Sequence, residues 1–137
     1  MKAFLELTKS GIVVFVLLSG LAGYAVSFPM GQTIELWQPI LLLLGLYFLS
    51  SGSFALNQAQ EWRVDSAMPR TRLRPLPTGK LEVWQAYVLS VIYISLGLFL
   101  LYIVQPLSAY VGLLTVLLYN GFYTLLWKPR WSFVAVL

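Results

Sequence analysis

The feature that most constrains this chain is a run of 45 residues, 83–127, without a single charged side chain. A second charge-free run covers the 25 residues 36–60, and the 18 residues 11–28 also contain no charge. A helix needs about 20 apolar residues to cross a hydrocarbon core about 30 Å thick. Because 59% of all residues are hydrophobic and only 10% are charged, the composition indicates an integral membrane protein. We therefore expect an all-α, multi-span helical bundle.

The charge-free runs predict four complete spans, at about 11–28, 39–59, 83–104 and 107–127. The longest run is divided by Gln105-Pro106, which predicts a tight hairpin between the last two spans. A secretory signal peptide is the competing interpretation of the first segment, but no convincing small-residue cleavage site follows it. Residues 131–137 resemble the start of a fifth span, so we expect 1–137 to be one partial membrane domain.

The basic residues predict how the chain is oriented in the membrane. All nine lie before the first span, after the second or after the fourth: Lys2, Lys9, Arg63, Arg70, Arg72, Arg74, Lys80, Lys128 and Arg130. The connections on the opposite side, 29–38 and 105–106, contain none. The positive-inside rule then places the amino terminus and the loop 61–82 in the cytoplasm, with the spans in the cell's inner or plasma membrane. The basic residues that set this orientation account for the net charge of +4, so the charge does not indicate nucleic-acid binding. We therefore expect no nucleic-acid partner.

Two residue types are missing, and their absence excludes several kinds of chemistry within these residues. The chain has no cysteine, so it contains no disulfide and no thiolate metal site. It also has no histidine, which excludes His-activated nucleophiles and His-ligated zinc or haem iron. Any metal bound here must be a hard cation with oxygen ligands.

Ionisable groups concentrate in one stretch, 57–79, with the sequence NQAQEWRVDSAMPRTRLRPLPTG. Asn57, Glu61 and Asp65 are spaced four residues apart, so on a helix they drift by only about 40° per step and share one face. Mg²⁺ in proteins takes one or two carboxylates together with waters and substrate phosphate oxygens. The pattern therefore predicts Glu61 and Asp65 as Mg²⁺ ligands.

The arginines that follow suggest the substrate of such a site. Arg70, Arg72 and Arg74 lie in a proline-rich loop, and guanidinium groups make bidentate contacts with phosphate oxygens. A metal site beside these arginines predicts a lipid diphosphate whose tail lies among the spans. The alternative is a solvated acidic helix face next to a basic loop that serves only orientation.

Two motifs carry a family resemblance. The pattern NxxxExxxD followed by MPRTRLRPLPTG resembles the first signature of the UbiA-type membrane prenyltransferases. Glutamate in the middle position, with the continuation M-x-R-T-x-x-R-P-L-P-x-G, is most similar to the protoheme IX farnesyltransferase (haem O synthase) branch. A weaker match is YNGFYTLLWK, which resembles the segment that closes the fourth span in the same family, at Tyr119, Tyr123, Thr124 and Lys128.

The resemblance implies a bundle around a cavity that opens to the cytoplasm, and Mg²⁺-dependent transfer of a farnesyl group from farnesyl diphosphate to a vinyl group of haem b. The products would be haem O and diphosphate. By matching position, the catalytic residues that hold Mg²⁺–diphosphate would be Asn57, Glu61 and Asp65. The residues that bind the diphosphate itself would be Asn57, Arg70 and Arg74. The resemblance covers the amino-terminal half of the family, whose second acidic motif we expect in sequence beyond this chain.

Two other functions remain compatible with the residues. A UbiA-type transferase that prenylates an aromatic acid or a quinone precursor would share the motif, because the motif contacts the diphosphate and not the acceptor. A non-catalytic four-span membrane scaffold would have the same spans and basic loop, and would not depend on Asp65.

Overall fold

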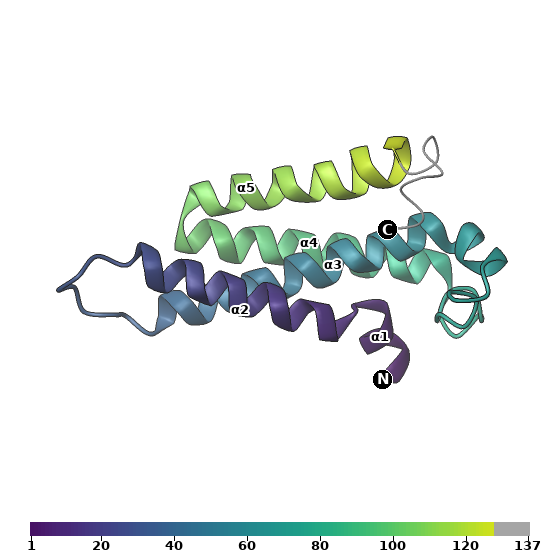
Figure 1. The fold of residues 1–137 in the computed structure, drawn as a ribbon, viewed down its shortest axis with the longest axis horizontal. Coiled ribbons are helices and arrows are strands. Elements are labelled where there is room, and N and C mark those ends of the chain that lie inside the picture. The colour runs from purple at the N-terminus through teal and green to yellow at the C-terminus, as the bar shows by residue number, and fades with distance from the viewer. Residues whose placement is uncertain (128–137) are drawn as a thin grey trace.

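The computed structural model describes residues 1–127 as helices joined by turns, and these residues form no strand. The helices are α1 (Lys2–Leu7), α2 (Ser10–Ser27), α3 (Trp37–Ala67), α4 (Val83–Val104), α5 (Pro106–Val116) and the π-helix η1 (Leu117–Trp127). Four long rods lie side by side, with α1 and the loop 68–82 at one end and the loop 28–36 and the α4–α5 hairpin at the other (Figure 1). The predicted all-α membrane bundle is confirmed.

Three segments are long and apolar enough to cross a membrane, judged by length and composition: Trp37–Ala67, Val83–Val104 and Pro106–Leu126. They correspond to the second, third and fourth predicted spans. The first predicted span is a shorter apolar helix, Gly11–Ser27. The predicted start of a fifth span, together with Lys128 and Arg130, lies outside the described residues.

The longest helix, α3, carries the central motif and ends two residues before Pro69. The residue before Pro69 is Met68, which has extended dihedral angles of φ −96° and ψ 129°. A residue that precedes proline is disfavoured in the helical region, so the helix stops at Ala67. Residues 61–67 of the predicted loop 61–82 are therefore helical.

The fourth predicted span contains two kinds of helix. Pro106 occupies the first position of α5. An N–H group at this position would have no partner within the helix, so proline, which lacks one, costs no hydrogen bond. From Leu117 the helix widens into η1, in which backbone bonds join residues five apart rather than four. The sequence pattern did not predict this change, which alters the faces that Asn120 and Thr124 present.

Small residues allow α3 and α4 to approach closely. A Cβ atom added at Gly97 would lie 2.5 Å from the backbone nitrogen of Leu49 and 2.8 Å from the carbonyl oxygen of Gly45. Backbone atoms inside a helix cannot move aside, so only glycine fits at this contact. Small residues at helix contacts are the usual means of close packing between membrane helices.

The amino terminus, which precedes the first predicted span, forms the short helix α1 and docks on α3. The side chain of Gln58 donates hydrogen bonds to the carbonyl oxygens of Leu7 at 2.7 Å and Glu6 at 3.3 Å. These are carbonyls at a helix end, which have no partner within the helix itself. Leu7 is fully buried in the cluster beneath them, so α1 is held close to the motif.

Gly97→Ala tests the α3–α4 contact. We expect it to lower the free energy of unfolding by about 1–3 kcal/mol, because the added methyl group overlaps backbone atoms. Gly23→Ala is the matched control, since no atom lies within 4 Å of its added Cβ. Alanine is intrinsically favoured over glycine in helices by about 0.5–1 kcal/mol, so the control should be neutral or stabilised. Thermal unfolding in detergent, followed by circular dichroism, measures both; equal stability of the two variants would contradict the packing argument.

Candidate functional site

The side chain of Asn57 lies in the second half of α3 and is held from two sides. Its Nδ2 donates to Oε2 of Glu61 at 3.1 Å, one turn further along the same helix. Its Oδ1 accepts a hydrogen bond of 2.9 Å from the hydroxyl of Thr124, which lies on η1. An ionised carboxylate only accepts hydrogen bonds, so the amide must turn its NH₂ group toward Glu61. The Glu61 carboxylate therefore selects the orientation of this buried amide, and the Thr124 hydroxyl anchors it from η1.

A second hydrogen bond joins the same two helices one turn away. Nδ2 of Asn120 donates to Oγ of Ser53 at 2.6 Å, and both side chains are buried. Ser53 and Asn57 are four residues apart on α3, and Asn120 and Thr124 are four residues apart on η1. The two bonds, Asn120–Ser53 and Thr124–Asn57, thus form a two-rung polar ladder between α3 and η1.

At the end of α3, Asp65 connects the helix to the loop 68–82. Nη1 of Arg74 lies 2.7 Å from Oδ2 of the Asp65 carboxylate, and the Asp65 side chain is almost completely buried. The Thr71 hydroxyl donates to the backbone carbonyl of Asp65 at 2.9 Å. Leu76 and Leu81 are buried beside α3, so the loop packs against the bundle rather than extending into solvent.

The predicted site residues include two hydrogen-bonded pairs. Asn57 bonds Glu61, and Asp65 bonds Arg74. Arg70 is exposed and, within residues 1–127, has no hydrogen bond or ion pair. Their positions on one helix and its adjoining loop agree with the sequence pattern, while their roles toward Mg²⁺ and diphosphate remain predictions.

The oxygen donors fit a Mg²⁺ ion that is shared with a substrate. In the part of the chain that the structure describes, no three His, Cys, Asp or Glu side chains gather into a group that could hold a metal by themselves. Glu61 and Asp65 stand one turn apart on α3, and Asn57 adds an amide N–H that can donate to a phosphate oxygen. Two carboxylates with ligands from water and phosphate are a usual environment for Mg²⁺. The donor set therefore suits a Mg²⁺–diphosphate, not a closed protein site.

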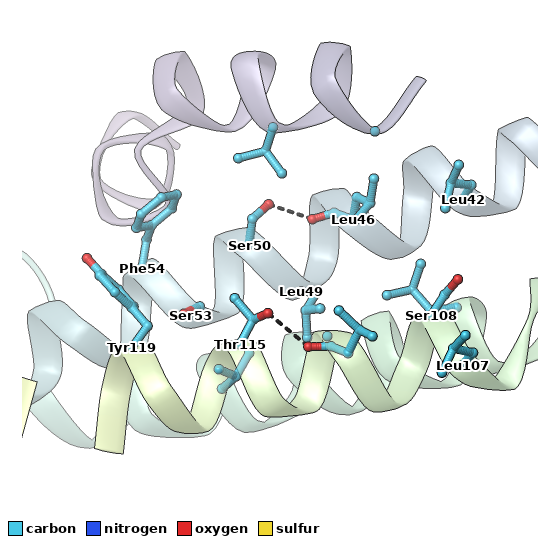
Figure 2. A pocket seen from close by; sticks show the side chains of 16 residues that line it. Leu42, Leu46, Leu49, Ser50, Ser53, Phe54, Leu107, Ser108, Thr115 and Tyr119 are labelled. Atoms are coloured by element: carbon cyan, nitrogen blue, oxygen red, sulfur yellow. Dashed lines mark hydrogen bonds between the residues drawn. The ribbon is translucent and has the colours of Figure 1, made fainter. Parts of the chain in front are cut away.

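Below the polar groups lies an apolar cavity of about 640 Å³, within the range of about 300–1,000 Å³ that small-molecule sites span. It lies between α2, α3 and the α5–η1 rod, and aliphatic side chains form most of its wall (Figure 2). Figure 2 shows Phe54 and Tyr119 together at one end, with Leu42 and Leu107 at the other. Since Phe54 precedes Asn57 by less than one helical turn, the aromatic end adjoins the polar groups.

Aromatic rings surround that end of the cavity. The rings of Phe54 and Tyr119 meet edge to face at 6.3 Å, and Tyr119 stacks on Tyr123 at 6.0 Å. The Lys9 ammonium lies 5.4 Å from the centre of the Phe54 ring. Ring faces carry partial negative charge and attract cations. At this end of the cavity an aromatic face therefore already holds a cation, the Lys9 ammonium.

Ser53 and Asn120 were not predicted as site residues, although the sequence contains a signal for them. Each lies four residues before another polar residue, Asn57 or Thr124, within a charge-free run. Such spacing puts both members on one helix face, and polar side chains at membrane depth usually face protein or a water-filled cavity. Two matched polar pairs on different spans therefore suggest that the spans face each other.

The chain is similar to several proteins of known name. It matches the sequence model of the UbiA prenyltransferase family over residues 13–137. It is 50% identical over 137 residues to "Protoheme IX farnesyltransferase" of Bdellovibrio bacteriovorus, covering 99% of this chain and 47% of that protein. The protein of the same name in Opitutus terrae is 41% identical over 130 residues, covering 94% of this chain and 42% of that protein. "Protoheme IX farnesyltransferase, mitochondrial" of Debaryomyces hansenii is 34% identical over 122 residues, covering 88% of this chain and 26% of that protein.

No solved structure matches the chain. The chain spans about half the length of its Bdellovibrio relative, 47%, and a smaller share of the other two. The family match nevertheless covers residues 13–137, which include the motif of α3 and the polar residues of η1. The family resemblance of the motifs is thereby confirmed, and the chain belongs to the UbiA prenyltransferase family.

Proposed function

We propose that the protein transfers the farnesyl group of farnesyl diphosphate to a vinyl group of haem b, giving haem O and diphosphate. Membership of a prenyltransferase family and the name shared by its relatives support this reaction. One observation carries the proposal: acidic and amide side chains on α3 adjoin the aromatic end of an apolar cavity of about 640 Å³. This is the arrangement that an amphiphile with a diphosphate head and a hydrocarbon tail requires.

The diphosphate would lie at the end of α3. Asn57 would donate its amide N–H to a phosphate oxygen, and Glu61 and Asp65 would be the carboxylate ligands of Mg²⁺. Bound there, the metal would supply positive charge that stabilises the leaving diphosphate. The exposed Arg70 would reach the outer phosphate from the loop 68–82.

Arg74 would exchange one anionic partner for another. It pairs with Asp65 at 2.7 Å, which gives the buried carboxylate a counter-charge. If Asp65 held a cation instead, the planar guanidinium would be able to turn to the diphosphate. Arginine suits both partners because it forms bidentate contacts with carboxylates and phosphates alike.

The farnesyl chain would occupy the cavity with its allylic carbon beside Phe54 and Tyr119. The carbon–oxygen bond to the diphosphate breaks, and its electron pair leaves with the diphosphate. The π electrons of the haem vinyl group form the new carbon–carbon bond. Water then adds to the cation left on the haem side chain and loses a proton, which gives a hydroxyl group. The apolar walls would keep water away from the allylic cation.

The protein is a multi-pass membrane protein, and we assign the end that holds α1 and the loop 68–82 to the cytoplasmic side of the plasma membrane. The Lys and Arg residues of the described part of the chain all lie in α1 and its junction with α2, in the last turns of α3 or in this loop. Figure 1 places these segments at one end of the bundle. The positive-inside rule supports the orientation.

Membranes from cells that express the complete gene test the reaction. Incubated with farnesyl diphosphate, Mg²⁺ and haem b, they should form haem O, detected by mass spectrometry. Glu61→Gln and Asp65→Asn should each lower the rate by about 100-fold or more, because each removes a charge that is needed in the transition state. Prenylated 4-hydroxybenzoate in place of haem O would identify another acceptor. Diphosphate binding that Asp65→Asn leaves untouched would support a non-catalytic scaffold.

Arg74→Ala should weaken Mg²⁺-dependent binding of farnesyl diphosphate by about 10- to 100-fold, since a hydrogen bond to a charged group contributes about 1.5–3 kcal/mol. Arg74→Lys should recover only part of this, because an ammonium lacks the planar fork. Arg72→Ala, in the same loop but exposed, should bind almost as the wild type does. Calorimetric titration of purified protein in detergent gives the three affinities. Full recovery by lysine would mean that position 74 serves only charge or orientation.

A further inference from the structure

We propose that Thr124 is a positioning residue, whose hydroxyl fixes the side-chain amide of Asn57 so that its NH₂ group points at Glu61 and the diphosphate. The inference rests on the proposed function, because it concerns how that site is oriented. The observation behind it is the 2.9 Å hydrogen bond from Thr124 Oγ1 to Asn57 Oδ1, made between two helices and out of contact with solvent.

An asparagine amide has two orientations that differ by exchange of its oxygen and NH₂ group. In one, Nδ2 faces Glu61 and Oδ1 faces the Thr124 hydroxyl, as observed. In the other, the amide oxygen would face a carboxylate, and two acceptors would repel each other. While Glu61 is available as an acceptor, it helps to select the first orientation.

Substrate binding changes which partner selects the orientation. If the carboxylate of Glu61 turns to a cation, its hold on the Asn57 NH₂ group weakens. The phosphate oxygens, which only accept hydrogen bonds, would then keep the NH₂ group directed toward them. The hydroxyl of Thr124 remains as the group that anchors the amide to η1, and without it the NH₂ group would no longer be held at the position of the diphosphate.

The π-helix η1 brings the Thr124 hydroxyl within hydrogen-bonding distance of the Asn57 amide. Thr124 Oγ1 also lies 2.9 Å from the carbonyl oxygen of Tyr119, five residues earlier. Backbone hydrogen bonds in a π-helix join residues with the same separation. The single hydroxyl proton therefore has two acceptors in reach, one on η1 itself and one on Asn57. The ring of Tyr119 lines the apolar cavity, so one short segment orients both the cavity wall and the amide.

The second rung of the ladder separates positioning from simple bundle stability. Asn120 also makes a buried hydrogen bond from η1 to α3, at 2.6 Å to Ser53, but it does not contact Asn57. Asn120→Ala removes that bond and leaves the Asn57 amide with both of its partners. A purely structural role of the ladder predicts that losing either rung has the same consequence.

The experiment compares Thr124→Val, Thr124→Ser and Asn120→Ala with the wild type, all in the complete protein purified in detergent. The first readout is the dissociation constant of farnesyl diphosphate in the presence of Mg²⁺ and without haem b, measured by calorimetry. The second readout is thermal unfolding without Mg²⁺ or substrate. Formation of haem O by the wild type is assayed in parallel.

We expect Thr124→Val to raise the dissociation constant by about 10- to 100-fold, as is typical when a residue that orients a metal-site ligand is lost. Thr124→Ser, which keeps the hydroxyl, should bind as the wild type does. Asn120→Ala should unfold at a temperature as low as that of Thr124→Val but retain its affinity. Wild-type affinity in Thr124→Val, or an equal loss of affinity in Asn120→Ala, would overturn the inference.

Failure of the proposed function would look different. In that case the wild type would form no haem O, whereas the binding comparison would still report on Thr124. Mg²⁺-dependent binding that is lost in Thr124→Val and kept in Thr124→Ser would then support the positioning role at a diphosphate site with another acceptor.

Discussion

The position of η1 on α3 depends on two buried hydrogen bonds, from Thr124 to Asn57 and from Asn120 to Ser53. An amide or hydroxyl without a partner in an apolar bundle costs about 1–3 kcal/mol, so pairing these groups strongly favours one arrangement of the helices. A slide or rotation of η1 by one residue would break both bonds at once. Apolar contacts alone would not impose this, because leucine side chains pack nearly as well in neighbouring positions. The polar ladder therefore fixes the register that brings Thr124 to the motif.

Three different interactions attach three helices to α3. Glycines let α4 approach its backbone, with a Cβ at Gly97 only 2.5 Å from Leu49. The ladder attaches η1, and Gln58 attaches α1 through the carbonyl oxygens at that helix's end. Gln58 directly follows Asn57 in sequence, so the helix turns the two amides toward different neighbours. The motif is consequently surrounded by helices whose positions are each set by a specific contact.

Much of this architecture follows from local sequence signals. The absence of charge over 83–127 and the Gln105-Pro106 step were enough to predict α4, the hairpin and α5. The fourfold spacing of Asn57, Glu61 and Asp65 correctly placed them along one helix, since that geometry belongs to the helix itself. These features need no knowledge of distant residues, which explains why sequence patterns reveal them.

Other features depend on partners far away in sequence and were not predicted. The helix α1 forms before the first predicted span, because Leu7 is buried and Gln58, 51 residues later, donates a hydrogen bond to the Leu7 carbonyl oxygen. The widening into η1 similarly accompanies pairing with α3 across 67 residues. No window of local sequence contains such information. Matched polar pairs on separate spans were the available signal, and they indicate only that two faces meet.

The two hydrogen-bonded pairs of the site have an electrostatic reason. Two carboxylates one turn apart on α3 repel each other, and each needs a group that lowers the cost of its charge. Asp65 is buried more deeply and is paired with a full positive charge from Arg74, while the partly exposed Glu61 has the dipole of an amide. Arg74 and Asn57 thus lower the cost of the two charges separately, and their guanidinium and amide N–H groups are donor types that a diphosphate could use.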